Sequence, residues 1–280
     1  MKNLKNIIVV ILSACLLAGC ANDQYSIEKN YWKAKKSADS IFNNPHASPP
    51  FELERAVKLL DAFSKKYHEN DLSVDAQFKI ASLYLVKKQY DKGRARLGQI
   101  IDVYSDSKLV SSEALFLVGK SYELEDKWGL ALNHYKRIIK EYPLTKKGFD
   151  VPLYIAQYYK IKYQPDKMNA AYREAAVHYK TLAGKHEDSL IGFSAYNLVA
   201  RCYMALKEWD KSIDSFNIII DKYKGKVNLD SIYLNTALIY KNELKNKSGA
   251  RGMIEKLIEE YPQSKLTNTA TDLLKEIDKK

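Results

Sequence analysis

One short motif recurs along this chain at nearly constant spacing: a small residue followed three positions later by a tyrosine. The successive tyrosines of the motif are 38, 37, 44 and 37 residues apart, and a second tyrosine follows each of them about 20 residues later. Self-similarity with a period of about 20–50 residues is typical of repeat proteins, in which each unit is stabilised by its neighbours. The five copies are Ala81 and Tyr84, Gly119 and Tyr122, Ala156 and Tyr159, Ala200 and Tyr203, and Ala237 and Tyr240.

The stretch from Ser111 to Thr145 shows what one unit contains. Apolar residues recur in it at steps of three and four, in two segments that are separated by a polar turn around Asp126. Such steps place the apolar residues on one face of a helix, and Pro143 ends the second helix. The stretch therefore predicts a helical hairpin in which Gly119 and Ala131 lie where the two helices approach most closely.

In spacing, this unit resembles the tetratricopeptide repeat (TPR), whose pattern is W-x2-L-G-x2-Y, then A-x3-F, then P. The unit departs from the pattern at its first position, where leucine replaces tryptophan. The resemblance implies an all-α fold, a right-handed superhelix of about six TPR-like hairpins followed by a C-terminal capping helix. The matching positions are, in order, Leu115, Val118, Gly119, Tyr122, Ala131, Tyr135 and Pro143.

The spacing also predicts how the chain is divided. A proline-rich loop over residues 43–50 interrupts the first repeat, and we expect an enlarged loop in residues 184–192, where the tyrosine spacing is longest. The other spacings exceed the 34 residues of the ideal repeat, which favours extended turns. In the last repeat, one extra residue gives Ala250 the role of Ala131. The predicted segments are a signal peptide (1–19), a lipidated N-terminus with a degenerate first repeat (20–72), TPR-like repeats (73–264) and a capping helix (265–280).

The N-terminus carries the features of a bacterial lipoprotein. Lys2 and Lys5 precede a short apolar run, and the Leu-Ala-Gly-Cys sequence that ends at Cys20 resembles a lipobox. The resemblance implies that Cys20 becomes the first mature residue and carries diacylglycerol and an N-acyl chain such as palmitate. Ala21 behind it implies the outer membrane, facing the periplasm. The alternative is a cytosolic protein with an apolar start and a chance cysteine.

The chain is basic, with a formal net charge of +11. Lysine pairs such as Lys65-Lys66, Lys87-Lys88 and Lys146-Lys147 fall near predicted helix ends, where cations can offset the helix dipole. An export signal argues against nucleic acid as a partner. Anionic lipid, cell-wall polymer or an acidic protein surface would suit the charge better.

The sequence holds no recognisable catalytic motif. Its five histidines do not form an H-E-x-x-H pattern, and it lacks a glycine-rich phosphate loop and a G-x-S-x-G turn. We therefore predict no enzyme, no cofactor and no metal ion. Cys202, the only cysteine left after export and lipidation, is expected to be a small buried residue within the helix 193–206.

A stack of such hairpins presents a groove lined chiefly by the first helices. The TPR resemblance directs a mixed amide and basic set of side chains into this groove, which suits the backbone or carboxylates of an extended peptide. The alternative is that these side chains are merely solvated. The candidate partner-binding residues are Lys79, Ser82, Lys120, Gln157, Lys160, Asn197, Arg201, Asn235 and Lys241.

Together, a lipobox and TPR-like repeats predict a lipid-anchored periplasmic scaffold for protein partners. The plan is similar to that of lipoproteins that assemble β-barrel proteins in the outer membrane. Pilotins of secretin pores, and lipoproteins that coordinate cell-wall synthesis with division, share it. An enzyme acting on cell-wall glycan is the alternative of a different class.

Overall fold

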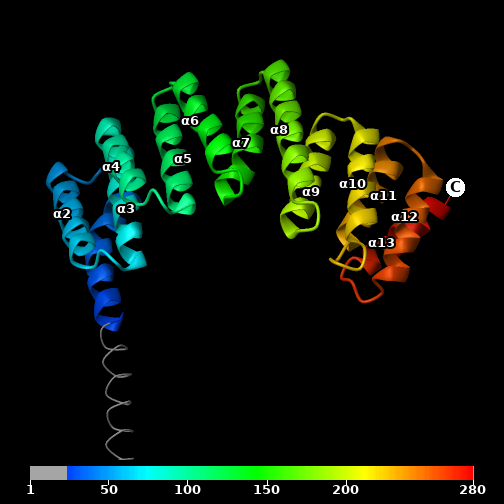
Figure 1. The fold of residues 1–280 in the computed structure, drawn as a ribbon, viewed down its shortest axis with the longest axis horizontal. Helices are drawn as coiled ribbons and strands as arrows, with labels where there is room; N and C mark the ends of the chain where they lie inside the picture. Colours follow the sequence, from blue (N-terminus) through cyan, green and yellow to red (C-terminus); the bar gives the residue numbers. More distant parts are fainter. Residues whose placement is uncertain (1–23, 280) are drawn as a thin grey trace, which may run out of the picture. The chain divides into compact units, whose positions relative to one another are not determined.

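The computed structural model describes residues 24–279, and all regular secondary structure within them is helical (Figure 1). The all-α fold is thus confirmed, whereas the predicted signal peptide and Cys20 lie outside the described residues. No helix in the described range has the length and apolar character needed to cross a bilayer. A first helix over residues 24–43 is followed by α2 (Pro50–Lys66), α3 (Asp71–Val86), α4 (Tyr90–Val103), α5 (Lys108–Leu124), α6 (Trp128–Glu141), α7 (Lys146–Ile161), α8 (Pro165–Lys185), α9 (Leu190–Ala205), α10 (Trp209–Tyr223), α11 (Asp230–Leu238), the π-helix η1 (Ile239–Glu243), α12 (Lys247–Glu260) and α13 (Thr267–Asp278).

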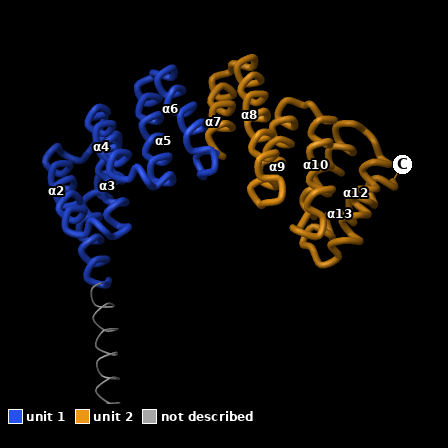
Figure 2. Tube along the Cα trace, viewed as in Figure 1, with its two compact units in different colours: residues 1–148 blue, residues 149–280 orange. Residues whose placement is uncertain are grey.

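The chain forms two compact units, which Figure 2 shows in different colours. The division falls between Gly148 and Phe149, inside α7. In unit 1, contacts connect α2 to α3, α3 to α4, α4 to α5 and α5 to α6, and in unit 2 they run in the same way from α8 to α12 and α13. The helices therefore pair as hairpins, with α3, α5, α9 and α11 as first helices and α4, α6, α10 and α12 as second helices. α7 and α8 follow the same order as first and second helix, and the Tyr179 hydroxyl of α8 donates to the Phe149 carbonyl oxygen of α7.

In the hairpin of α5 and α6, the two helices pack closely at a glycine. A Cβ atom added at Gly119 would lie 2.4 Å from Cε1 of Tyr135, so any side chain there would overlap the buried ring. Ala131 is also fully buried, as predicted for the point of closest approach. The equivalent fourth residue of α8 is Met168, which is only half-buried, so this hairpin packs differently. The fourth residues of the other second helices are small and buried, and they are Gly93, Ala131, Ser212 and Ala250.

The tyrosine of each motif also shapes the turn that follows it. The backbone N–H of Lys127, five residues after Tyr122, donates to the Tyr122 carbonyl oxygen at 2.8 Å, and Asp126 between them has a φ of 57°. This is the Schellman arrangement that ends a helix with one left-handed residue, usually glycine. Here the left-handed residue is never glycine. Left-handed residues occur in all five turns of this kind, and they are Lys88, Asp126, Tyr163, Lys207 and Lys245.

In unit 1, the tyrosine that ends a second helix is followed three residues later by the N-cap of the next first helix. The N–H of Ser107 donates to the carbonyl oxygen of Tyr104 at 2.9 Å, and its hydroxyl accepts from Val110. Thr145 repeats both bonds, with Tyr142 and Gly148. Serine and threonine are preferred at such positions because their oxygens satisfy free N–H groups at the helix start. The Tyr-Pro-Leu-Thr sequence at residues 142–145 is thus a turn joined to a helix cap.

The extra residue of the last repeat is absorbed by a π-helix. The N–H of Asn246 donates to the Tyr240 carbonyl oxygen at 2.8 Å, six residues back instead of five, and the segment Ile239–Glu243, which contains Tyr240, is π-helical. A π-turn is the usual result of inserting one residue into a helix. Ala250 is then fully buried, as expected for a residue in the role of Ala131.

The predicted enlarged loop and the predicted extended turns both differ from the structure. Residues 184–192 do not form an enlarged loop, because α8 extends to Lys185 and α9 begins at Leu190, and the long spacing reflects the 21 residues of α8. The turns of the neighbouring repeats are not extended either. They comprise residues 87–89, 104–107, 125–127 and 142–145.

One lysine pair does not have the predicted role. Lys65 and Lys66 lie in the last turn of α2, where cations are favourable. Lys146 and Lys147, however, begin α7, where the dipole disfavours them. Lys147 is held by other contacts: its Nζ lies 3.3 Å from Glu113 and 4.0 Å from the centroid of the Phe116 ring.

Candidate partner-binding surface

The nine side chains predicted to face a partner all lie on first helices, if η1 is counted as the continuation of α11. None of them is fully buried, and Gln157, Lys160 and Arg201 are exposed. The structure divides them between its two units. Lys79, Ser82 and Lys120 belong to unit 1, and Gln157, Lys160, Asn197, Arg201, Asn235 and Lys241 belong to unit 2.

Four of these residues share one position in the repeat. Ser82, Lys120, Gln157 and Arg201 each follow directly after the small residue of the motif. The small residue faces the second helix of its own hairpin, as Gly119 faces Tyr135. The next residue is rotated by about 100° around the helix axis. Equivalent repeats therefore present these four side chains from equivalent faces.

Three of the predicted cations have acidic partners within the protein. Lys79 lies 3.7 Å from Asp75 on the same helix, and Lys120 lies 2.9 Å from Glu123. Lys241 forms an ion pair with Glu276 of α13. Ion pairs of this partly exposed kind contribute only about 0–1 kcal/mol. A partner carboxylate could therefore replace the internal acid at low cost.

The structure adds an acid and an aromatic ring that the sequence analysis missed. Glu123 accepts a hydrogen bond from the hydroxyl of Tyr135, so it links the Lys120 ion pair to the second helix. Phe116 packs 5.5 Å from the Tyr135 ring. Phe116, Lys120 and Glu123 occupy positions i, i+4 and i+7, and this spacing could have identified them as one face. The face is therefore mixed in charge.

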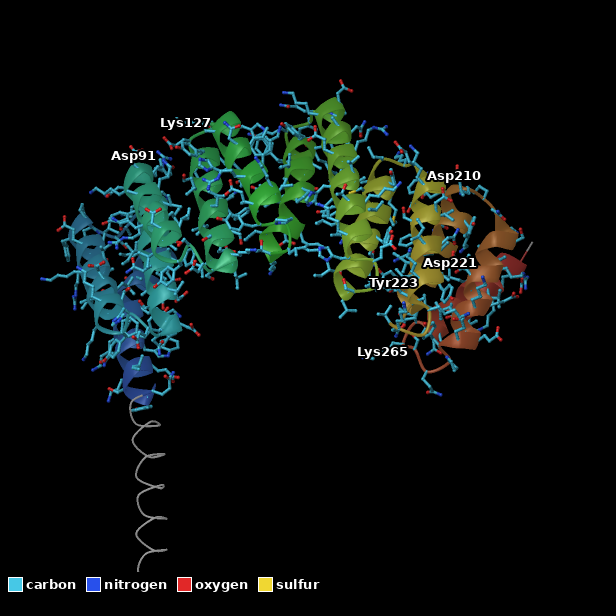
Figure 3. All side chains as sticks on the ribbon, in the orientation of Figure 1. Asp91, Lys127, Asp210, Asp221, Tyr223 and Lys265 are labelled. Carbon is cyan, nitrogen blue, oxygen red and sulfur yellow. The ribbon has the colours of Figure 1, made fainter. Side chains whose placement is uncertain are left out.

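A second polar cluster joins neighbouring hairpins in unit 1. Arg94 of α4 donates to Ser121 at 3.2 Å, forms an ion pair with Glu125 after α5, and lies 4.4 Å from the centroid of the Tyr122 ring. Hydrogen bonds from Lys127 and Arg94 lower the pKa of Glu125. Asp91 and Lys127, labelled in Figure 3, lie at the turn ends of their hairpins. These contacts are structural, since every charged group involved has a partner within the protein.

Neither a reactive cysteine nor a metal-binding cluster occurs in the part of the chain that the structure describes. Cys202 is fully buried in α9, and burial raises the pKa of its thiol to about 12. It is therefore a small packed residue, as predicted, and not a thiolate nucleophile. Within residues 24–279, no group of histidine, cysteine and acidic side chains has the arrangement of a metal site.

The hairpins coincide with matches to a known repeat family. The sequence model of the tetratricopeptide repeat matches residues 75–107, 113–145, 198–225 and 232–264. These segments cover most of the hairpins of α3 and α4, α5 and α6, and α11 and α12, together with the second half of α9 and all of α10. The chain is thus an all-α protein built of helical hairpin repeats. More specifically, it contains tetratricopeptide repeats and has a TPR fold.

Solved structures with related architecture are distant in sequence. BtubC (BKLC) from P. vanneervenii is 17% identical, with a TM-score of 0.42, over 83% of this chain and 90% of that chain. The TPR2AB domain of yeast Sti1, in complex with pHSP90, is 11% identical, with a TM-score of 0.33, over 89% and 98%. A putative kinesin light chain from Podosopora anserina is 13% identical, with a TM-score of 0.37, over 72% and 98%. No curated protein matches the chain significantly.

Proposed function

We propose that this protein is a lipid-anchored scaffold of the bacterial envelope that binds protein partners through its first helices. The observation that carries the proposal is the repetition of accessible polar residues at one repeat position, from Ser82 to Arg201. Tandem TPR hairpins bind protein or peptide partners, and polar side chains repeated along them suit an extended segment.

The proposed place of action follows from the sequence before the described residues. Two lysines, an apolar run and the Leu-Ala-Gly-Cys sequence ending at Cys20 are the successive parts of a lipoprotein export signal. Several acyl chains on Cys20 would attach the mature protein stably to a membrane, because each buried methylene contributes about 0.8 kcal/mol. The repeats would then act in water at the surface of that membrane.

The partner system that we propose is the assembly of β-barrel proteins in the outer membrane. The proposal rests on the resemblance of the overall plan, a lipobox followed by repeats ending in Tyr-Pro-x-Ser/Thr, to the assembly lipoprotein BamD. Depletion of the protein should then lower the levels of several outer-membrane β-barrel proteins together. Quantitative proteomics of purified outer membranes measures this directly.

The depletion experiment also separates the proposed role from other envelope functions. If β-barrel proteins stay at normal levels, the assembly role is wrong. Loss of oligomers of a single secretin on depletion would instead indicate a pilotin. A separate assay tests the enzyme alternative: release of soluble fragments from sacculi by the purified protein would indicate an enzyme. Re-expression of the wild-type chain is the control, and it should restore the β-barrel proteins.

A further inference from the structure

The helix over residues 24–43 has an outer face whose side chains are largely exposed. Its inner face is buried against α2 and α3, and the ring of Tyr31 lies 5.3 Å from the ring of Phe63 in α2. Figure 1 shows this helix in dark blue, projecting past the ends of α2 and α3. The buried residues of its inner face are Tyr31, Ala34, Ala38 and Ile41.

Two aromatic side chains stand on the outer face. Tyr25 and Trp32 are 63% and 62% exposed, although tryptophan is usually among the more buried residue types. They are seven residues apart, which is about two helical turns, so they point to the same side. A shallow hollow of about 600 Å³ runs beside them, and its lining residues are Tyr25, Glu28, Lys29, Trp32, Lys33, Lys36 and Asp39.

The charged groups on this face that have no partner of opposite charge among residues 24–279 are lysines. Glu28 and Asp39 lie at its edge, where Glu28 accepts a hydrogen bond from Gln24 at 2.9 Å and Asp39 lies 3.8 Å from Lys35. Lys35 also lies 4.5 Å from the centroid of the Trp32 ring. Three exposed lysines remain that have no acidic partner among residues 24–279, and they are Lys29, Lys33 and Lys36.

We propose that this outer face rests on an anionic lipid surface. Tryptophan and tyrosine favour the boundary between water and lipid because one end of the ring is apolar and the other is polar. Lysines near a bilayer are attracted by negatively charged headgroups, and each strengthens binding about fivefold. The face therefore combines the two groups that a membrane interface selects.

The position of this helix in the chain supports lipid over other anions. Gln24 is only four residues after Cys20, and four residues of chain span at most about 14 Å. If Cys20 is acylated, the start of the helix must lie close to the headgroups. The inference thus deepens the proposed membrane attachment, because it names the part of the folded protein that touches the membrane.

Tryptophan fluorescence can test the contact in the full chain. The purified protein is bound to vesicles of phosphatidylglycerol and phosphatidylethanolamine whose acyl chains carry bromine, which quenches nearby indole rings. The quenchable signal of the wild type should fall strongly in the Trp32→Phe variant, since Trp128 and Trp209 remain in both. It should also fall when neutral phosphatidylcholine replaces the phosphatidylglycerol.

Charge variants give a matched control. Replacing Lys29, Lys33 and Lys36 by glutamine should remove most of the Trp32 quenching. Replacing Lys180, Lys185 and Lys265, three exposed lysines in unit 2, removes the same charge and should leave the quenching unchanged. Equal losses in both triple variants would overturn the inference, because they would indicate a response to net charge alone.

Metabolic labelling with palmitate distinguishes this contact from the anchor itself. Label that is lost in Cys20→Ala supports the anchor. Labelled protein whose Trp32 is not quenched would overturn the lipid contact and leave the anchor standing. Quenched Trp32 on unlabelled protein would support the lipid contact and overturn the anchor. If the protein shows neither label nor Trp32 quenching, the anchor and the lipid contact are both wrong.

Discussion

At the scale of single residues, the repeat depends on positions where a side chain must be small. Gly119 is buried against the ring of Tyr135, and the ring in turn bonds Glu123 through its hydroxyl. The same tyrosine thus fills the space left by the glycine and positions an acid on the surface of the first helix. Packing and surface chemistry are connected through one side chain.

Replacing Gly119 with leucine should destabilise unit 1. The new side chain would overlap Tyr135, and overpacking of this kind costs about 1–3 kcal/mol. Urea unfolding followed by circular dichroism measures the change. The control is Gly129→Leu in the same hairpin, where an added Cβ meets nothing within 4 Å. Equal stability of the Gly119→Leu protein and the wild type would show that the hairpin does not close as described.

A half-buried histidine should make the fold sensitive to acid. Desolvation, together with the nearby Arg137 and Arg94, lowers the pKa of His134, which also stacks on the ring of Tyr122 at 5.4 Å. The unfolded chain therefore binds a proton on this residue at higher pH than the folded chain does. The free energy of unfolding should fall as the pH drops below about 6.5, the ordinary value for histidine.

Urea titrations at a series of pH values check this expectation. In His134→Gln, the decrease between neutral and mildly acidic pH should become smaller. His68, whose side chain is 76% exposed, provides the matched control, and His68→Gln should keep the slope of the wild type. A His134→Gln protein with an unchanged slope would contradict the argument.

At the scale of helices and turns, the regular pattern comes from two joints that alternate along the chain. The first joint is the turn after each first helix, which contains a left-handed residue. The second joint is the turn before the next first helix, where an N-cap such as Ser107 or Ser189 begins that helix. The first joint carries strain, because a residue with a Cβ atom in the left-handed region costs about 1–2 kcal/mol. The array tolerates this cost five times.

Relief of that strain should be measurable at one turn. Lys207 has a φ of 58°, so Lys207→Gly should stabilise the protein by about 0.5–1 kcal/mol, after allowance for the greater freedom of glycine in the unfolded chain. Lys180→Gly, inside α8, should instead destabilise it by about 1 kcal/mol. Thermal unfolding of both variants measures the two changes, and changes of the same sign would show that the left-handed turn carries no such strain.

The sequence predicted the helices better than it predicted their lengths. Small and aromatic residues such as Gly119 and Tyr135 mark contacts that any hairpin of this kind must make, so their spacing identified the fold. The extension of α8 to Lys185 has no such marker, because alanine-rich and lysine-rich sequence suits a long helix and a loose loop end equally well. The ion pair of Lys241 with Glu276 was also unpredictable, since it depends on how α13 packs.

At the scale of the whole molecule, two surfaces have different chemistry. The first helices present amides and cations, several of them already paired with internal acids, which suits reversible binding of a polar segment. The outer face of the helix over residues 24–43 presents exposed rings and lysines that have no acidic partner among residues 24–279, which suits a lipid surface. The membrane-attached scaffold that we propose would use one surface for its partner and the other for the lipid.

Photo-crosslinking in living cells tests the central claim most directly. A photoreactive amino acid at Arg201, on the first helix α9, should capture a component of the β-barrel assembly system. The same group at Asp214, exposed on the second helix α10 of the same unit, should capture none. Capture at Asp214 or at loop positions, with none at Arg201, would contradict binding through the first helices.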